Sequence, residues 1–260
     1  MRKFSVATCV AVLLALTGAS SAMAEQYVAL GDSFSSGTGT RTYFHTGCQR
    51  SIYAYPSLVD VQRPNTELVF AACSGARTGD VLNNQVSSLT SSTRWVTITI
   101  GGNDAGFSSV ITTCAQPSWL SNCDAAINTA QSYIQNTLPA QLTNVYNAIK
   151  SRSPNATVIV LSYPRLFMGV DCNAGTFFSG AEMTRLNQTA DQLRNVTQSR
   201  AIAAGANFRF QDAIPPFVGH AVCSSTEWLN GLSNPIGESY HPNRTGHSSG
   251  YAPLVRAIMN

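Results

Sequence analysis

Tyr27-Val28-Ala29-Leu30-Gly31-Asp32-Ser33-Phe34-Ser35-Ser36-Gly37 starts as an apolar strand and changes to small polar residues at Gly31. An apolar strand that ends in turn residues, early in a mixed chain, is typical of the central strand of a parallel sheet. Ser33 follows the carboxyl end of this strand, where open α/β sheets bind their ligands. If a helix begins there, the hydroxyl and N–H groups lie at a positive helix terminus, which suits a nucleophile that creates an oxyanion. The alternative is a turn in which Asp32 or Ser33 only caps a helix.

Residues 1–24 have the pattern of a secretory signal peptide. Arg2 and Lys3 precede an apolar run over residues 4–16, and small residues lead to Ala22-Met23-Ala24. A charged start, an apolar centre and an A-x-A end predict cleavage after Ala24. The apolar run is too short to span a membrane, and no later segment reaches the required length. We therefore expect a secreted, extracellular protein with no integral membrane segment, whose residues 25–260 form one domain.

The cysteine and charge content fits export and narrows the class of partner. Six of the seven cysteines follow Ala24, and an even number in an exported chain favours disulfides, although six cysteines permit many pairings. None has the C-x-x-C spacing of a zinc site. The formal net charge of +3 includes Arg2 and Lys3, so the rest of the chain is nearly neutral. Without a basic block or a basic–aromatic stripe, we expect no nucleic-acid partner.

Strand and helix patterns alternate along the chain. Strands are expected at 27–30, 67–72, 95–100, 156–161 and 208–210, and helices at 125–151, 180–204 and 246–258. This alternation predicts an α/β domain with a parallel sheet covered on both faces. Small, glycine-containing turns follow three of the strands, and the carboxyl ends of parallel strands lie at one edge of the sheet. We expect the functional site at that edge.

Four residues near this edge fit the needs of ester hydrolysis, which requires a nucleophile, a base and oxyanion donors. Ser33 supplies the hydroxyl and one N–H, Gly75 a second N–H, and Asn103 a side-chain amide. His241 is the preferred base, because it stands in a loop before the last helix with Glu238 three residues upstream. Taken singly, each residue also fits a structural role as a turn glycine, a helix cap or a loop residue.

Together the segments that hold these residues resemble the SGNH, or GDSL, hydrolase family. They read Gly31-Asp32-Ser33-Phe34, Ser74-Gly75-Ala76, Gly101-Gly102-Asn103-Asp104 and Glu238-Ser239-Tyr240-His241-Pro242. The resemblance covers residues 25–260 and is nearest to secreted bacterial lipases, esterases and phospholipases A1, which also carry six cysteines. It implies a three-layer α/β/α, flavodoxin-like sandwich with a central parallel sheet. It also implies Ser33 as nucleophile, His241 as base and an oxyanion hole of Ser33, Gly75 and Asn103.

Two positions depart from the family's pattern. Phe34 replaces the usual leucine, and an aromatic ring there still packs. Glu238 stands where many members have the aspartate of D-x-x-H. We favour Glu238 as the third catalytic residue, which would hold the Nδ1–H of His241. The alternative is a backbone carbonyl of Glu238 or Ser239, which would leave a serine–histidine pair.

The positions of the cysteines suggest a pairing. Cys114 and Cys123 are close in sequence and would close one loop after the third strand. A Cys48–Cys73 bridge would brace the nucleophile and oxyanion loops, and Cys172 then pairs with Cys223. Each bridge is expected to stabilise the fold by roughly 2–4 kcal/mol.

The substrate class is less strongly indicated. Apolar residues in the site loops suit acyl chains, namely Phe34, Tyr43, Phe44, Phe107, Tyr163, Leu166, Phe167 and Met168. With the resemblance, they favour fatty-acyl glycerolipids over the alternatives of a broad carboxylesterase or a carbohydrate acetyl esterase. A lipid- or carbohydrate-binding module is the non-enzymatic alternative. We expect a monomer that needs no metal or other cofactor, since no H-E-x-x-H or comparable ligand cluster is present.

Gly246-His247-Ser248-Ser249-Gly250 matches G-x-S-x-G, the nucleophile elbow of α/β-hydrolases. That elbow needs a strand before it and an acid and a histidine later in the chain. Neither condition holds here, so we interpret this segment as the start of the last helix.

Overall fold

The computed structural model describes residues 1, 3 and 24–259, so nearly all of the predicted signal peptide lies outside the described residues. The sheet has five parallel strands in the order β2-β1-β3-β4-β5. The strands are β1 (Glu25–Gly31), β2 (Thr66–Phe70), β3 (Thr93–Thr99), β4 (Thr157–Leu161) and β5 (Phe208–Gln211). The predicted α/β class with a parallel sheet is confirmed.

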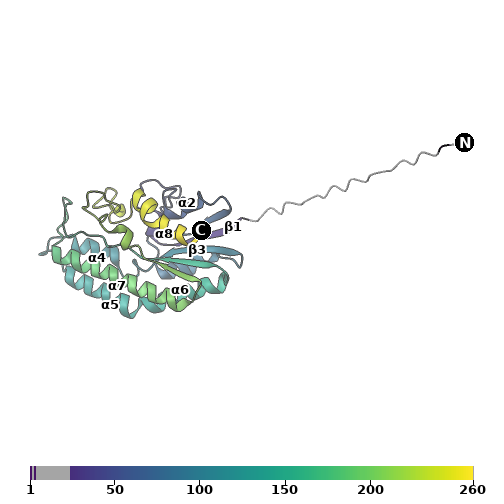
Figure 1. The fold of residues 1–260 in the computed structure, drawn as a ribbon. Helices are drawn as coiled ribbons and strands as arrows, with labels where there is room; N and C mark the ends of the chain where they lie inside the picture. The colour runs from purple at the N-terminus through teal and green to yellow at the C-terminus, as the bar shows by residue number, and fades with distance from the viewer. Residues whose placement is uncertain (2, 4–23, 260) are drawn as a thin grey trace.

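Helices cover both faces of the sheet (Figure 1). The α-helices are α1 (Ser33–Ser36), α2 (Tyr55–Asp60), α3 (Thr78–Asp80), α4 (Phe107–Cys114), α5 (Cys123–Asn136), α6 (Leu138–Arg152), α7 (Gly180–Ala204) and α8 (Ala252–Met259). Short 3₁₀ or π turns lie at Val81–Gln85, Val86–Ser88, Pro215–Phe217, Ile236–Glu238 and Gly246–Tyr251. Helices α5, α6 and α7 pack together on one face, and α2 and α8 pack on the other, which gives three layers. Within residues 24–259 no helix has the length and apolar character needed to cross a membrane.

Strand β1 lies between β2 and β3 and is buried from Tyr27 to Leu30. It is an interior strand, although β3 and not β1 is the middle strand of the five. The order 2-1-3-4-5 is the flavodoxin-like order, in which the chain reverses its direction of winding between β1 and β3. A crevice opens at such a switch point beyond the carboxyl ends of the strands. The segments after β1 and β3, which carry Ser33 and Asn103, meet there.

The helical pattern over residues 125–151 belongs to two helices instead of one. Helix α5 ends at Asn136 and α6 begins at Leu138, with Pro139 in the first turn of α6. Proline has no N–H to donate to the preceding turn, and it is tolerated in a first helical turn. The predicted helix at 180–204 has the bounds of α7. The G-x-S-x-G segment forms the π turn that leads into α8, as the interpretation of a helix start requires.

Candidate active site

The turn after β1 presents Ser33 at the start of α1. Gly31 has a φ of +122°, and a Cβ there would collide with the carbonyl oxygen of Thr99 on β3. The side-chain amide of Gln85 accepts from the N–H of Gly31 at 2.8 Å and donates to its carbonyl at 2.9 Å. Only glycine fits this close approach, and the two bonds fix the backbone just before the serine.

Asp32 joins this turn to the turn after β3. One carboxylate oxygen caps α1 by accepting from the Phe34 N–H at 3.0 Å, and the other accepts from the hydroxyl of Tyr163. That hydroxyl in turn accepts from the Gly102 N–H at 3.1 Å. Burial raises the pKa of the Asp32 carboxyl to about 7, against the opposing effect of these hydrogen bonds. In the sequence, only the position of Asp32 at the end of a buried strand indicated that it caps α1. The sequence did not reveal Tyr163 as its second partner.

His241 faces Ser33 across the crevice. Its Nε2 lies 2.9 Å from the Ser33 Oγ, and its Nδ1 lies 2.9 Å from the backbone carbonyl oxygen of Ser239. A carbonyl can only accept, so Nδ1 carries the proton and Nε2 is left to accept from the serine hydroxyl. Burial lowers the pKa of the imidazole to about 4, and the bond to Ser239 partly offsets that effect. The ring is therefore a neutral acceptor at physiological pH.

Glu238 does not make the predicted contact with His241. Its Oε1 accepts from the hydroxyl of Tyr43 at 2.6 Å, and its Oε2 lies 3.7 Å from the Nε of Arg41. The residue sits in a 3₁₀ turn that turns its side chain toward residues 39–43 and leaves the carbonyl of Ser239 beside the imidazole. The preferred interpretation was wrong, and the alternative of a Ser239 backbone carbonyl holds in the structure.

Asn103 and Gly75 lie on two loops that are tied together. The Asn103 side-chain amide donates to the Ala76 carbonyl at 3.0 Å, which leaves its second N–H for a ligand, and Asn103 lines the same cavity as Ser33. The Asp104 carboxylate accepts from the Thr78 N–H at 3.1 and 3.0 Å. Gly75 is exposed in the turn before Ala76 and is absent from the cavity lining. Among residues 24–259, neither its N–H nor that of Ser33 donates to a protein acceptor.

A cavity of about 570 Å³ opens beside Ser33, Asn103 and His241. Most of its wall is apolar, and the larger apolar side chains in it are Phe34, Phe107, Ile111, Tyr163, Leu166, Leu193, Leu232, Ile236 and Tyr240. A cleft of this size with few polar groups at one end is typical of a small-molecule site.

The cavity contains half of the apolar residues predicted for it. Phe34, Phe107, Tyr163 and Leu166 line it, whereas Tyr43, Phe44, Phe167 and Met168 are absent from its lining. Tyr43 binds Glu238, Phe44 packs on Phe70, Phe167 packs on Phe178, and Met168 is exposed. The closeness of these four residues to the site turns in the sequence did not reveal that their side chains point away from the cavity.

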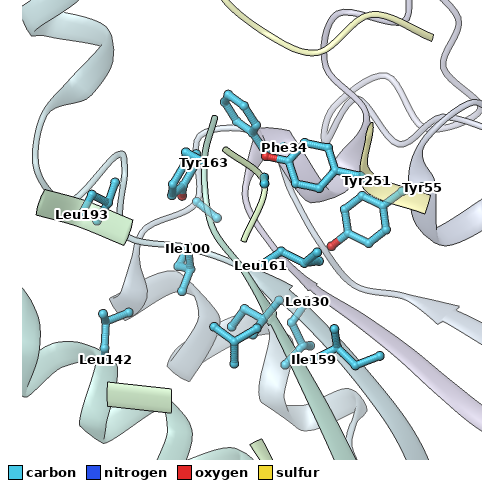
Figure 2. Packing of buried hydrophobic residues seen from close by; sticks show 14 of the residues in the cluster. Leu30, Phe34, Tyr55, Ile100, Leu142, Ile159, Leu161, Tyr163, Leu193 and Tyr251 are labelled. Carbon is cyan, nitrogen blue, oxygen red and sulfur yellow. The ribbon is translucent and has the colours of Figure 1, made fainter. Parts of the chain in front are cut away.

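Phe34 packs where the family's leucine would stand. Its ring meets Tyr163 edge-on at 4.9 Å between centroids and lies 5.3 Å from the ring of His241. Figure 2 shows Phe34 beside Tyr163, with Tyr251 and Tyr55 continuing this aromatic layer. The aromatic side chain therefore packs directly against the imidazole of His241.

The disulfides join Cys48 to Cys73, Cys114 to Cys123 and Cys172 to Cys223, the pairs suggested from the sequence. The other histidines lie apart from the cavity lining. His45 accepts from the Cys48 N–H, His220 stacks on Trp228 with 3.8 Å between ring centroids, and His247 is buried against Tyr55 and Tyr251. These three histidines therefore make structural contacts away from the cavity.

Comparison with known proteins gives consistent matches over most of the chain. The family model described as GDSL-like lipase/acylhydrolase matches residues 29–248. A lipase of Streptomyces rimosus is 46% identical over 253 residues, covering 94% of this chain and 92% of that protein. Lipase 1 of Streptomyces coelicolor is 45% identical over 251 residues, covering 93% of this chain and 91% of that protein.

The solved structures agree with these matches. The crystal structure of the extracellular Streptomyces rimosus lipase has a TM-score of 0.84 and covers 90% of this chain and 99% of its own. The structure of phospholipase A1 from Streptomyces albidoflavus NA297 also has a TM-score of 0.84, with 42% identity and the same coverage of both chains.

Proposed function

The chain belongs to the GDSL-like lipase/acylhydrolase family and is a carboxylic ester hydrolase of the lipase type, and we propose that it cleaves fatty-acyl esters of glycerolipids through an acyl-enzyme on Ser33. The observation that carries the proposal is the 2.9 Å contact between Ser33 Oγ and His241 Nε2 at the end of an apolar cavity. This contact activates the Ser33 hydroxyl, and the apolar wall of the adjoining cavity suits an acyl chain.

In the proposed first step, the Ser33 Oγ attacks the ester carbonyl carbon while Nε2 of His241 takes the hydroxyl proton. The resulting imidazolium keeps its Nδ1–H on the Ser239 carbonyl, 2.9 Å away. As the tetrahedral intermediate collapses, the imidazolium gives its proton to the leaving alcohol oxygen. The acyl group stays on Ser33.

The second step releases the acid. Water gives a proton to His241 Nε2 and attacks the acyl carbonyl, and the collapse returns that proton to the Ser33 oxygen. The negative oxygen in both steps is assigned to the Ser33 N–H, the Gly75 N–H and the free N–H of the Asn103 amide. The two backbone groups have no other acceptor within residues 24–259, and the Ala76 carbonyl holds the amide toward the cavity.

The relatives support the lipid substrate, because the similar proteins are called lipase and phospholipase A1. We also propose secretion, with residues 1–24 removed and residues 25–260 acting as one hydrolase domain. The three disulfides and the extracellular relative support export. We propose that the protein works as a monomer without a cofactor.

Product analysis tests the substrate class. The intact enzyme and its Ser33→Ala variant are incubated with triacylglycerol, phosphatidylcholine and acetylated xylan, and the released acids are quantified. We expect fatty-acid release from at least one glycerolipid by the intact enzyme alone. A clear preference for acetylated xylan would overturn the lipid substrate, and equal activity of Ser33→Ala would overturn the mechanism.

A further inference from the structure

We propose that the rim of the cavity is a docking surface for a neutral lipid–water interface, an inference that rests on the proposed glycerolipid function. The apolar rim consists of exposed side chains from three separate loops, Trp119, Leu120, Phe177, Leu232 and Ile236. Trp119 is 80% exposed, Phe177 56% and Ile236 76%. Large apolar groups that gather at one place on a surface mark an interaction site more often than scattered ones do.

Two hydrogen bonds join the three loops into one surface. The Phe177 N–H donates to the Ala115 carbonyl at 3.1 Å, which joins the second loop to the first. The Leu232 N–H donates to the Asn173 side chain at 3.2 Å, which joins the third loop to the second. Residues of all three loops line the cavity, so the apolar rim continues directly into the cavity wall.

Disulfides hold two of these loops in place. Cys114–Cys123 closes the loop that carries Trp119 and Leu120, and Cys172–Cys223 anchors the start of the loop that carries Phe177. A cross-linked loop has few alternative conformations. The exposed side chains of Trp119 and Leu120 are therefore held in the short cross-linked loop whose first residues, Ala115 and Gln116, line the cavity.

The loops contain no charge. Segments 115–123, 172–179 and 229–237 have no acidic, basic or histidine residue, although 11% of the chain is charged. Three carboxylates border these segments, and each has a partner within the described residues. Asp124, which follows the first segment and is exposed, pairs with Arg185. Asp171 accepts from the Thr176 hydroxyl at 2.7 Å and from the Phe178 N–H at 3.0 Å, and Glu238 accepts from Tyr43. A rim without charge fits an uncharged apolar partner and offers nothing to an ionic one.

The occupant must also leave the cavity open to substrate. A protein partner seated on the rim would cover the entrance through which an ester reaches Ser33. A lipid surface can bury the same side chains and supply an acyl chain to the entrance. Tryptophan and other large apolar side chains are favoured at the lipid–water boundary, where they insert by a few ångströms.

Binding is measured with the Ser33→Ala protein, which cannot consume the lipid, and vesicles of phosphatidylcholine. Trp119 is the exposed tryptophan, whereas Trp95 is buried and Trp228 stacks on His220. We expect a blue shift of tryptophan emission on addition of vesicles. Trp119→Ser should abolish most of the shift, and Trp119→Ser and Phe177→Ser should each weaken vesicle binding, followed by sedimentation, about tenfold. Binding should change less than about twofold between about 50 mM and about 500 mM salt.

Val61→Ser and Ile202→Ser are the matched controls. These side chains are 82% and 68% exposed, and both precede strands, at the opposite end of the sheet from Ser33. The controls should bind vesicles as the parent does. With Ser33 intact, Trp119→Ser should hydrolyse a soluble monomeric butyrate ester normally and vesicle phospholipid about tenfold more slowly.

Each other result rejects the docking surface. Equal vesicle binding by the rim variants and the control variants would reject it. Vesicle binding that disappears at high salt would also reject it. Rim variants that change self-association in solution, without changing vesicle binding, would assign the rim to a contact between two copies. Failure of the substrate proposal has a different signature, because an enzyme with the wrong substrate class would release no fatty acid even where Ser33→Ala binds vesicles.

Discussion

The nucleophile turn and the histidine loop supply the two partners of one hydrogen bond, Ser33 and His241. Different interactions hold each of these two segments in place. The nucleophile turn, residues 31–36, follows a buried strand and is held by Gln85, Asp32 and Tyr163. The histidine loop, residues 233–242, contains little regular structure and is held by a few contacts, including Asn230 to the Glu238 carbonyl at 3.3 Å and Tyr43 to the Glu238 side chain. The sheet thus positions Ser33, the proposed nucleophile, whereas a loop positions His241, the proposed base.

The histidine loop also packs closely against the backbone of Gly39. Gly39 has a φ of +98°, and a Cβ there would lie 2.6 Å from the Pro242 carbonyl oxygen and 2.9 Å from the His241 Cβ. The turn at residues 37–40 can therefore pass directly against the backbone of His241 and Pro242. The comparison teaches that a neutral backbone carbonyl, that of Ser239, orients the imidazole of His241, the proposed base.

Loss of either end of the Ser33–His241 hydrogen bond should have the largest effect. We expect Ser33→Ala and His241→Ala each to lower kcat by about 10⁴ or more, because the nucleophile and its base act as one unit. The midpoint of thermal unfolding of Ser33→Ala should change little. Ser248→Ala, at the exposed serine of the G-x-S-x-G segment, is the control and should keep full activity. Comparable losses in the control would contradict the assignment.

Removal of the Asn103 side-chain amide should have the second largest effect on kcat. Asn103→Ala should lower kcat by roughly 10²–10³, the usual cost of removing one oxyanion donor. KM should change much less, since the charge develops only in the transition state. Steady-state kinetics on a soluble ester measure both parameters. A loss confined to KM would instead assign Asn103 to ground-state binding.

Tyr163 tests the support of the nucleophile turn. Tyr163→Phe keeps the ring against Phe34 but removes the hydroxyl that joins Asp32 to Gly102. We expect about a tenfold lower kcat and a free energy of unfolding lower by about 1–3 kcal/mol, because a buried carboxyl loses its partner. Kinetics and denaturant unfolding should therefore change together. An unchanged kcat in a destabilised protein would limit Tyr163 to folding.

The pH profile tests the histidine loop. With the His241 pKa lowered to about 4 by burial, kcat/KM should stay level as pH falls to about 4 and then fall about tenfold per pH unit. The free energy of unfolding responds at a higher pH than kcat/KM does. The unfolded imidazole binds a proton near its ordinary pKa of 6.5, so the stability present above that pH declines as pH falls toward 4. An acid limb of kcat/KM near pH 6.5 would indicate a carboxylate partner instead of the Ser239 carbonyl if it remains in Asp32→Asn, because the pKa of Asp32 itself is raised to about 7 by burial.

Glu238 should give the smallest effect. Glu238→Gln keeps an oxygen acceptor for the Tyr43 hydroxyl and the shape of the 3₁₀ turn. We expect kcat to fall by less than about threefold, because the ring of His241 is held by Ser239. The same assay that measures His241→Ala provides the reference. A loss greater than about tenfold would restore the carboxylate as a third catalytic residue.

The sequence by itself determined the sheet, the switch-point position of Ser33 and the segment that carries His241. Apolar strands that end in small polar residues have a strong local signal, and Gly31 and Gly101 lie at turns where the backbone has a positive φ. Local signals do not, however, say which way a loop side chain points. Glu238 has the spacing of a catalytic acid, and only the packing of residues 39–43 against its turn directs it to Tyr43.

Contacts between segments far apart in the chain were decided by tertiary structure alone. Tyr163 reaches Asp32 across 131 positions, and Tyr43 reaches Glu238 across 195. The apolar rim combines loops that begin near residues 115, 172 and 229, and their lack of charge acquires meaning only where the fold sets them around one entrance. Such pairs have no periodicity or spacing along the chain, because burial and hydrogen bonding select them only after the sheet has brought the segments together.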